Sequence, residues 1–134
     1  CFASSSSKTH ASIAGTPAYM APELFVGDDG SVTTKCDVFS FSVLIWEMLS
    51  GQQPWEWLNN HMQIIFTVAI QSQRLPLDRH RAFARADWAS KSLVDDVLVP
   101  AWQTNPSARP DFDDIINVIT KCLRHIASED VGAL

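Results

Sequence analysis

The segment TTKCDVFSFSVLIWEMLSG, residues 33–51, limits the possible folds of this chain more than any other part of the sequence. Thr33 or Thr34 can cap the start of a helix, and Gly51 can end it. The residues between them are mostly large and apolar, namely Val38, Phe39, Phe41, Val43, Leu44, Ile45, Trp46, Met48 and Leu49. A helix that is apolar on nearly every side belongs inside a soluble domain. We therefore predict a buried central helix over about residues 34–50.

Three further stretches have apolar residues at the spacing of an amphipathic helix. The first has Met62, Ile65, Phe66 and Ala69, and the second has Leu93, Val97, Leu98 and Ala101. The third has Phe112, Ile115, Ile116, Ile119, Cys122, Leu123 and Ile126. Acidic residues open the third stretch and basic residues close it, which suits the helix dipole. Strand and hairpin patterns are absent from the sequence, so we predict a mainly α fold of four main helices.

The composition fits a globular domain, with 134 residues of which 46% are hydrophobic and 19% are charged. The net charge is -5, and no helix has the basic face of a recognition helix. Both features argue against a nucleic-acid partner. No apolar run reaches the length of a membrane span, so we expect no membrane segment.

The three cysteines, Cys1, Cys36 and Cys122, are far apart in the sequence and form no C-x-x-C pair. Cys122 and His125 have helical spacing, but no second ligand pair accompanies them, so we expect no metal site. Ordinary thiols of this kind fit a reducing compartment, and we expect a cytoplasmic protein. Because the chain begins with Cys1 rather than Met, we also expect a piece of a longer protein or a processed product.

Residues 14–24, AGTPAYMAPEL, contain too many helix breakers for one helix and too few polar residues for a free linker. Something must therefore hold this stretch in one irregular shape. Residues 3–12 before it are mostly Ser, Thr, Lys and His, which predicts a mobile loop.

Three blocks in this order and spacing resemble the C-terminal half of a protein kinase domain: GTPAYMAPE at 15–23, DVFSFSVLIWEMLSGQQPW at 37–55 and AWQTNPSARPDF at 101–112. The first block resembles serine/threonine kinases, and the other two resemble the tyrosine-kinase-like group. The resemblance implies a partial helical large lobe of a protein-kinase-like fold. Residues 1–23 would be the end of the activation segment with the substrate-docking loop, and residues 24–134 would be C-lobe helices.

The resemblance also implies roles for particular residues. Gly15, Thr16 and Tyr19 would help form the docking pocket for the protein substrate. Glu23 would pair with Arg109 and so clamp this stretch to the last helices. Without the motifs, the two charges would be interpreted as solvated surface residues.

Asp37 would accept hydrogen bonds from the backbone of a catalytic loop. That loop is missing from this chain, so we expect Asp37 to be exposed or unsatisfied here. The alternative is a first-turn acid that only favours the helix dipole.

Two other groups of residues keep two interpretations each. The residues Ser4, Ser5, Ser6, Ser7, Thr9 and Ser12 are either a plain flexible loop or activation-loop phosphorylation sites. Trp55 and Trp57 are either part of the core or a docking patch. The sequence also departs from the common family pattern at Phe39, Ser42 and Ala101, none of which carries chemistry.

The sequence contains no G-x-G-x-x-G, V-A-I-K, H-R-D or D-F-G motif. The resemblance therefore implies a parent kinase, with ATP and Mg as cofactors, that transfers the γ-phosphoryl group to Ser or Thr of protein substrates and acts with signalling partners. This chain alone would supply a substrate platform and scaffold, would hold neither ATP nor metal, and would be inactive. The alternative is a noncatalytic kinase remnant that serves as a protein-interaction module. In either case we expect exposed apolar area where the N-lobe and catalytic loop are absent.

Overall fold

The computed structural model describes residues 15–27, 32–77, 83 and 87–132. In chain order its helical elements are η1 (Pro17–Tyr19), α1 (Glu23–Val26), α2 (Thr34–Ser50), α3 (His61–Ile65), η2 (Phe66–Ile70), α5 (Trp88–Ser92), η3 (Leu93–Leu98), α6 (Val99–Ala101), η4 (Pro106–Ala108) and α7 (Phe112–Gly132). The elements η2 and η3 are π-helical turns that continue α3 and α5. These described residues contain no strand, and the mainly α prediction is confirmed.

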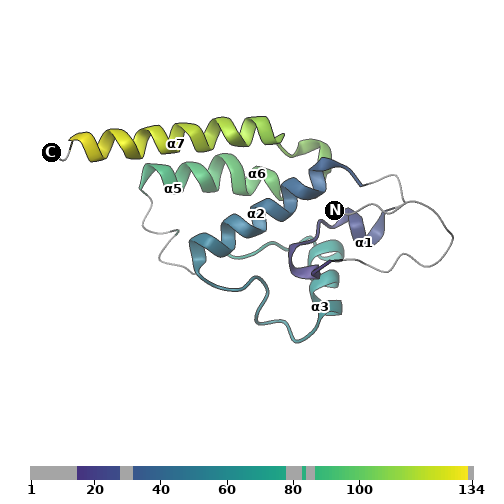
Figure 1. Cartoon of the computed structure of the whole chain (residues 1–134). Helices are drawn as coiled ribbons and strands as arrows, with labels where there is room; N and C mark the ends of the chain where they lie inside the picture. The colour runs from purple at the N-terminus through teal and green to yellow at the C-terminus, as the bar shows by residue number, and fades with distance from the viewer. Residues whose placement is uncertain (1–14, 28–31, 78–82, 84–86, 133–134) are drawn as a thin grey trace.

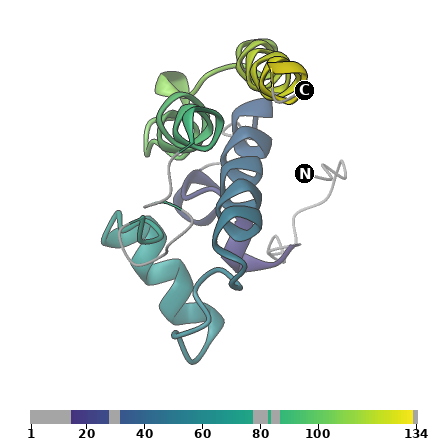
Figure 2. The same cartoon turned by 90° about the vertical axis from the view of Figure 1, so that its left-hand side faces the viewer.

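Helix α2 crosses the centre of the molecule (Figures 1 and 2). In the view of Figure 1, α7 lies above α5 and α6, and α3 lies on the other side of α2. The continuous helical stretch η3–α6 packs directly on α2, and α7 packs on α5 and η3. Helix α2 also contacts η1 and η4, so it links the N-terminal elements to the C-terminal ones.

The ends of α2 fall where the sequence predicts them. The Thr33 hydroxyl oxygen accepts a hydrogen bond from the Lys35 backbone N–H at 3.3 Å, and Gly51 ends the helix in the left-handed conformation with φ of 69°. Trp46 is fully buried, and its indole N–H donates to the Pro76 carbonyl at 2.9 Å. The helix is therefore anchored in the core and capped at both ends.

One side of α2 is nevertheless uncovered in this chain. The side chains of Leu44 and Met48 are 43% and 68% exposed. The sequence pattern, which is apolar on nearly every side, predicts full burial of this helix and does not show which side stays open. The two side chains form exposed apolar surface on α2. That this surface faces the N-lobe or the catalytic loop stays a prediction.

The helix that begins at α3 is buried on a different face from the predicted one. Ile64, Thr67 and Val68 are buried, whereas Met62 and Phe66 of the predicted stripe are 71% and 52% exposed. Both faces of this helix carry apolar residues, so periodicity alone does not determine which face packs inward. The predicted face is wrong for this reason.

The last two predicted stripes both contain buried residues. Val97, Leu98 and Ala101 are fully buried, and so are Ile115 and Cys122 on α7. The stripe on α7 is wider than the surface that covers it, because Ile116 and Leu123 remain 56% and 61% exposed. Figure 1 shows the C-terminal part of α7 extending past α5. None of the helices in the described ranges is long and apolar enough to cross a bilayer.

Candidate functional site

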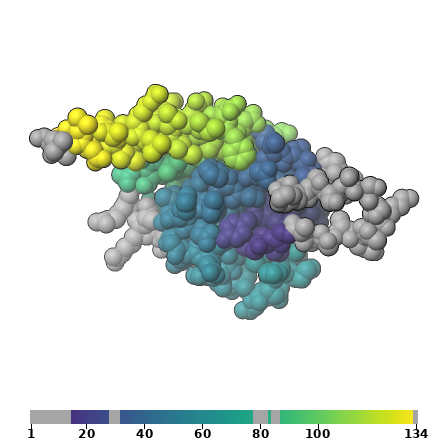
Figure 3. Space-filling model, in the orientation of Figure 1, coloured from purple at the N-terminus to yellow at the C-terminus, as the bar shows by residue number. Residues whose placement is uncertain are grey.

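Residues 15–23, called here the N-terminal segment, lie at the surface between α2 and α3 (purple in Figure 3). Pro17 and Ala21 are buried, and the Tyr19 N–H donates to the Thr16 carbonyl at 3.0 Å. Gly15 has φ of 145°, a conformation that L side chains rarely adopt, and its Cβ position lies 3.2 Å from the Met20 sulfur. The segment therefore has one fixed, irregular shape although it makes only a single 3-10 turn.

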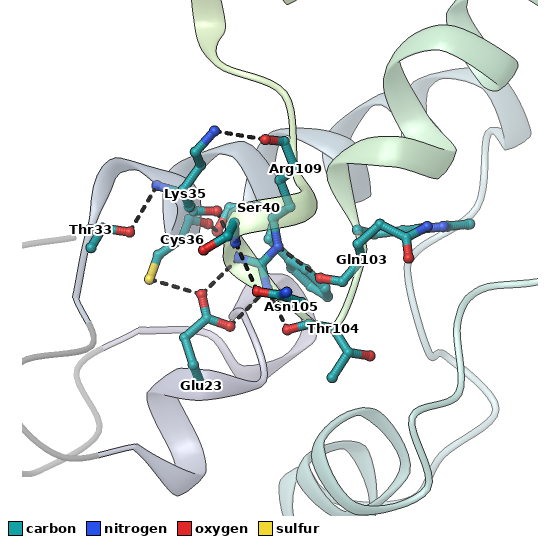
Figure 4. A network of polar contacts seen from close by, with 12 residues as sticks. Glu23, Thr33, Lys35, Cys36, Ser40, Gln103, Thr104, Asn105 and Arg109 are labelled. Atoms are coloured by element: carbon teal, nitrogen blue, oxygen red, sulfur yellow. Dashed lines mark hydrogen bonds and ion pairs between the residues drawn. The ribbon is translucent and has the colours of Figure 1, made fainter.

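Glu23 and Arg109 meet at the end of this segment in a bidentate ion pair (Figure 4). The Nη1–Oε1 and Nη2–Oε2 distances are 2.7 and 2.8 Å. The Arg109 side chain is 0% exposed and that of Glu23 is 11% exposed. We call this pair the Glu23–Arg109 fork. Removing one partner of such a buried pair lowers the free energy of unfolding strongly, because the other charge is left buried without a partner.

Every donor of the Arg109 guanidinium has an acceptor. Besides the two carboxylate oxygens, it donates from Nε to the Gln103 carbonyl at 2.8 Å, from Nη1 to the Lys35 carbonyl at 2.8 Å and from Nη2 to the Thr104 carbonyl at 3.4 Å (Figure 4). These acceptors come from α2 and from the loop before η4. The guanidinium thus joins three parts of the chain that are distant in sequence.

Cys36 adds a third donor to the Glu23 carboxylate, with its sulfur 3.2 Å from Oε1. Burial by itself would raise the pKa of Glu23, but the hydrogen bonds and charge of Arg109, together with the Cys36 thiol, outweigh it and hold that pKa below its ordinary value of 4.5. Burial also raises the pKa of the Cys36 thiol, so the thiol remains a donor. Sequence reasoning treated this cysteine as an ordinary core residue and missed the contact.

Phe39 lies next to two arginines. Its ring centroid is 5.1 Å from the Arg109 Cζ atom and 5.3 Å from that of Arg74, and only 3% of Phe39 is exposed. Burial and the neighbouring charge of Arg109 lower the pKa of Arg74. Arg74 carries no motif signal, since it is one of several arginines in a stretch without helical pattern, and the sequence did not indicate its position.

Lys35 fixes the backbone that carries Arg109. Its Nζ atom donates to the Arg109 carbonyl at 2.6 Å (Figure 4). The same Nζ atom pairs with Asp111 Oδ1 at 2.6 Å. Asp111 itself is 71% exposed, so this ion pair is a surface contact of small energy. The lysine therefore positions the loop before α7 rather than adding a second buried charge pair.

Tyr19 is tied to the central helix by a second contact. Its hydroxyl donates a hydrogen bond of 2.7 Å to Oε2 of Glu47 in the second half of α2. Burial and the Glu47 carboxylate raise the pKa of Tyr19 to about 12. The other two predicted docking residues, Gly15 and Thr16, are exposed at the start of the segment. The structure thus places all three on one short stretch.

Asp37 differs from the expectation. It is half-buried in the first turn of α2 and takes part in an interaction, so the prediction that it is exposed or unsatisfied is wrong. The prediction considered only the missing loop as a partner.

The candidate phosphorylation sites at residues 4–7, 9 and 12 lie outside the described residues.

The three residues that depart from the common family pattern, Phe39, Ser42 and Ala101, are all buried. Of the two tryptophans that could form a docking patch, Trp55 is 4% exposed and Trp57 is 48% exposed, with their ring centroids 5.6 Å apart. Ser42 is fully buried, and its hydroxyl donates to the Phe39 carbonyl at 2.6 Å. Within the described part of the chain, no three His, Cys, Asp or Glu side chains gather as a metal site.

The profile of the family described as "Protein tyrosine and serine/threonine kinase" matches residues 2–119. Similar curated proteins include "Probable serine/threonine-protein kinase SIS8" of Arabidopsis thaliana, 32% identical over 120 residues. "Mitogen-activated protein kinase kinase kinase 7" is 29% identical over 116 residues in Drosophila melanogaster and 27% identical over 116 residues in Homo sapiens.

These similarities cover 90%, 87% and 87% of this chain but only 10%, 15% and 17% of the length of the three relatives. The chain therefore spans less than a fifth of each relative. The name of the Arabidopsis thaliana relative agrees with the serine/threonine type of the first motif block. Because the family profile matches 2–119 of 134 residues, the chain belongs to the protein tyrosine and serine/threonine kinase family.

Proposed function

We propose that this chain is the substrate-side part of a kinase domain that transfers the γ-phosphoryl group of ATP to Ser or Thr of protein substrates. The observation that carries the proposal is the buried Glu23–Arg109 fork, which fixes the N-terminal segment against α2 and the loop before α7. Phosphoryl transfer depends mainly on positioning and electrostatic stabilisation. A rigid platform for the acceptor peptide is the contribution that these residues can make.

In this proposal residues 1–23 end the activation segment and residues 24–134 form part of the C-lobe. Gly15, Thr16 and Tyr19 line the docking site for the protein substrate. The exposure of the first two and the tie of Tyr19 to Glu47 support a preformed site with an open edge. ATP and magnesium would be held by residues of the parent protein, because the sequence here has none of the motifs that bind them.

Two further roles belong to the same proposal. Asp37, half-buried at the start of α2, would accept backbone hydrogen bonds from the catalytic loop of the parent domain. The Ser- and Thr-rich stretch at residues 4–12 would be phosphorylated and so regulate the segment that follows it. The parent would act in the cytoplasm with protein signalling partners.

The test is an assay of the full-length product with radiolabelled ATP, magnesium and a generic protein substrate, beside the 134-residue chain. We expect phosphotransfer to Ser and Thr by the full-length protein and none by the chain alone. A full-length protein that binds other proteins but transfers no phosphate, although it is folded, would instead identify a noncatalytic interaction module.

The docking role has a sharper test in the full-length enzyme. Tyr19→Ala should raise KM for the protein substrate by about tenfold and leave KM for ATP unchanged, because in this proposal the Tyr19–Glu47 contact shapes the docking site for the protein substrate. Gly132→Ala at the end of α7 is the matched control, since nothing lies near its Cβ position. Equal effects of Tyr19→Ala on both KM values would contradict the docking role.

A further inference from the structure

A groove between α5 and α7 lies apart from the N-terminal segment. Its volume is about 450 Å³, within the usual range of about 300–1,000 Å³ for binding pockets. Its apolar walls come from Trp88, Leu93, Ile119, Leu123 and Ile126. Figures 1 and 2 show α5 and α7 side by side, and the two helices are in direct contact.

The floor of the groove is buried, whereas several of its large apolar side chains remain exposed. The Cys122 thiol is buried beneath it and approaches the Ala89 carbonyl at 3.7 Å. Trp88, Leu123 and Ile126 are 50%, 61% and 45% exposed. Three large side chains that face one cavity and remain this exposed form a surface for a partner rather than scattered surface residues.

Two carboxylates line the groove, those of Asp87 and Glu129. Among the described residues that line it, none is a lysine or an arginine. Asp87 is held in place as the cap of α5, because its carboxylate accepts from the Ser90 N–H at 2.8 Å and from the Ser90 hydroxyl at 3.1 Å. Glu129 Oε1 lies 3.3 Å from His125 Nε2, and the His125 ring contacts the Trp88 ring in a tilted arrangement with a centroid distance of 4.5 Å.

We propose that the α5–α7 groove binds a short amphipathic peptide segment of another protein, one that carries large apolar side chains flanked by lysine or arginine. The apolar side chains fill the space above Trp88 and Leu123, and the basic residues approach Asp87 and Glu129. Helix-in-groove binding of this type reads an apolar face and uses rim charges for orientation and rate. The proposal does not depend on kinase activity or on the docking role of the N-terminal segment.

The probe is a fluorescein-labelled synthetic helical peptide with leucines on one face and lysines at both ends. Its binding to the 134-residue chain is measured by fluorescence anisotropy, beside a peptide in which every lysine is replaced by glutamate. We expect the lysine peptide to bind at least about tenfold more tightly than the glutamate peptide at low salt. The difference should shrink as salt screens the rim charges.

Variants locate the binding site. Leu123→Asp should weaken binding of the lysine peptide by at least about tenfold, because it places a charge in the apolar centre of the groove. Asp87→Asn with Glu129→Gln should weaken it by about three- to tenfold and remove most of its salt dependence, while asparagine preserves the helix cap. Met62→Asp is the matched control, because Met62 lies on α3 and is 71% exposed. This variant should bind the lysine peptide as tightly as the unsubstituted chain does.

Near-ultraviolet circular dichroism confirms that each variant is folded, and sedimentation velocity reports self-association. The proposal is overturned if the unsubstituted 134-residue chain binds neither peptide or binds both equally. It is also overturned if Leu123→Asp binds the lysine peptide as tightly as Met62→Asp does. If the unsubstituted chain dimerises and Leu123→Asp is monomeric, the occupant of the groove is a second copy of the chain, and the proposal is also overturned.

Discussion

The hydroxyl of Tyr19 donates a 2.7 Å hydrogen bond to Glu47, which lies 28 residues further along the chain near the end of α2. Together with the Glu23–Arg109 fork, this contact fixes the N-terminal segment at two points. One point is a neutral donor on a carboxylate, and the other is a buried charge pair. The two points respond to pH at opposite ends of the scale, which allows each to be measured by itself.

The alkaline end reports the Tyr19 contact. The chain has one tyrosine, so the ultraviolet absorbance of phenolate belongs to Tyr19 alone. We predict a folded-state pKa of about 12, against 10.0 for an ordinary tyrosine, because burial and Glu47 disfavour the anion. Since the folded pKa is the higher one, this contact contributes stability below about pH 10 and loses it as the pH rises toward 12.

Glu47→Gln is the control for that titration. The amide removes the negative charge but leaves an acceptor for the hydroxyl, so the tyrosine pKa should fall toward its ordinary value. An absorbance titration that is the same in both proteins would show that Glu47 does not act on Tyr19.

The acid end reports the Glu23–Arg109 pair. The pKa of Glu23 is lower in the folded chain than its ordinary 4.5, so the pair stabilises the fold above that pH. Its contribution should be lost as the pH falls from about 5 through the folded pKa, because the unfolded chain takes up the proton first. Urea midpoints measured from pH 7 to pH 3 test this, and Glu23→Gln should flatten the decline.

Phe39 should contribute more to the free energy of unfolding than its buried apolar area alone would give. Phe39→Leu keeps an apolar side chain but removes the ring that faces Arg74 and Arg109. We expect a loss of about 1–3 kcal/mol in the free energy of unfolding, from lost packing and lost cation–π contacts. Phe41→Leu is the comparison, since Phe41 is half-buried and contacts the Phe112 ring at 5.9 Å without a cation. An equal or larger loss for Phe41→Leu would rule out the contribution of the arginines.

Gly15 should resist substitution. Gly15→Ala places a methyl group 3.2 Å from the Met20 sulfur at φ of 145°, and we expect it to cost about 1–3 kcal/mol. Gly132→Ala, in the last turn of α7 with nothing near its Cβ position, should be neutral or slightly stabilising. Denaturant unfolding of the two variants checks both, and a neutral Gly15→Ala would contradict the fixed shape of the N-terminal segment.

Sequence reasoning found the elements whose signals are local. The start of α2 at the Thr33 cap and its end at Gly51 follow from residue types that act within one turn. It failed where a choice depends on the rest of the fold. Nothing in the pattern of α3 and η2 shows that Ile64 and Val68 are buried while Met62 and Phe66 are exposed, because both faces are apolar.

Some residues of the candidate site could be predicted from the sequence, and others could not. The resemblance to kinases named Glu23 and Arg109, which the structure places in contact across 86 residues of sequence. The residues around them, Cys36 and Arg74, were missed because a thiol donor and a cation beside a phenyl ring have no sequence signature. Arg74 lies beside Phe39, and Cys36 lies beside Glu23, because of tertiary packing that single-sequence patterns do not encode.

The most direct test of the account is a double-mutant cycle of Glu23→Gln and Arg109→Met in the chain, followed by urea unfolding at pH 7. We predict that each single variant loses on the order of 3–5 kcal/mol and that the double variant loses little more than either one, because each single change leaves a buried group without its partner. Losses that simply add, with no coupling between the two residues, would contradict the claim that this pair holds the N-terminal segment to the helical core.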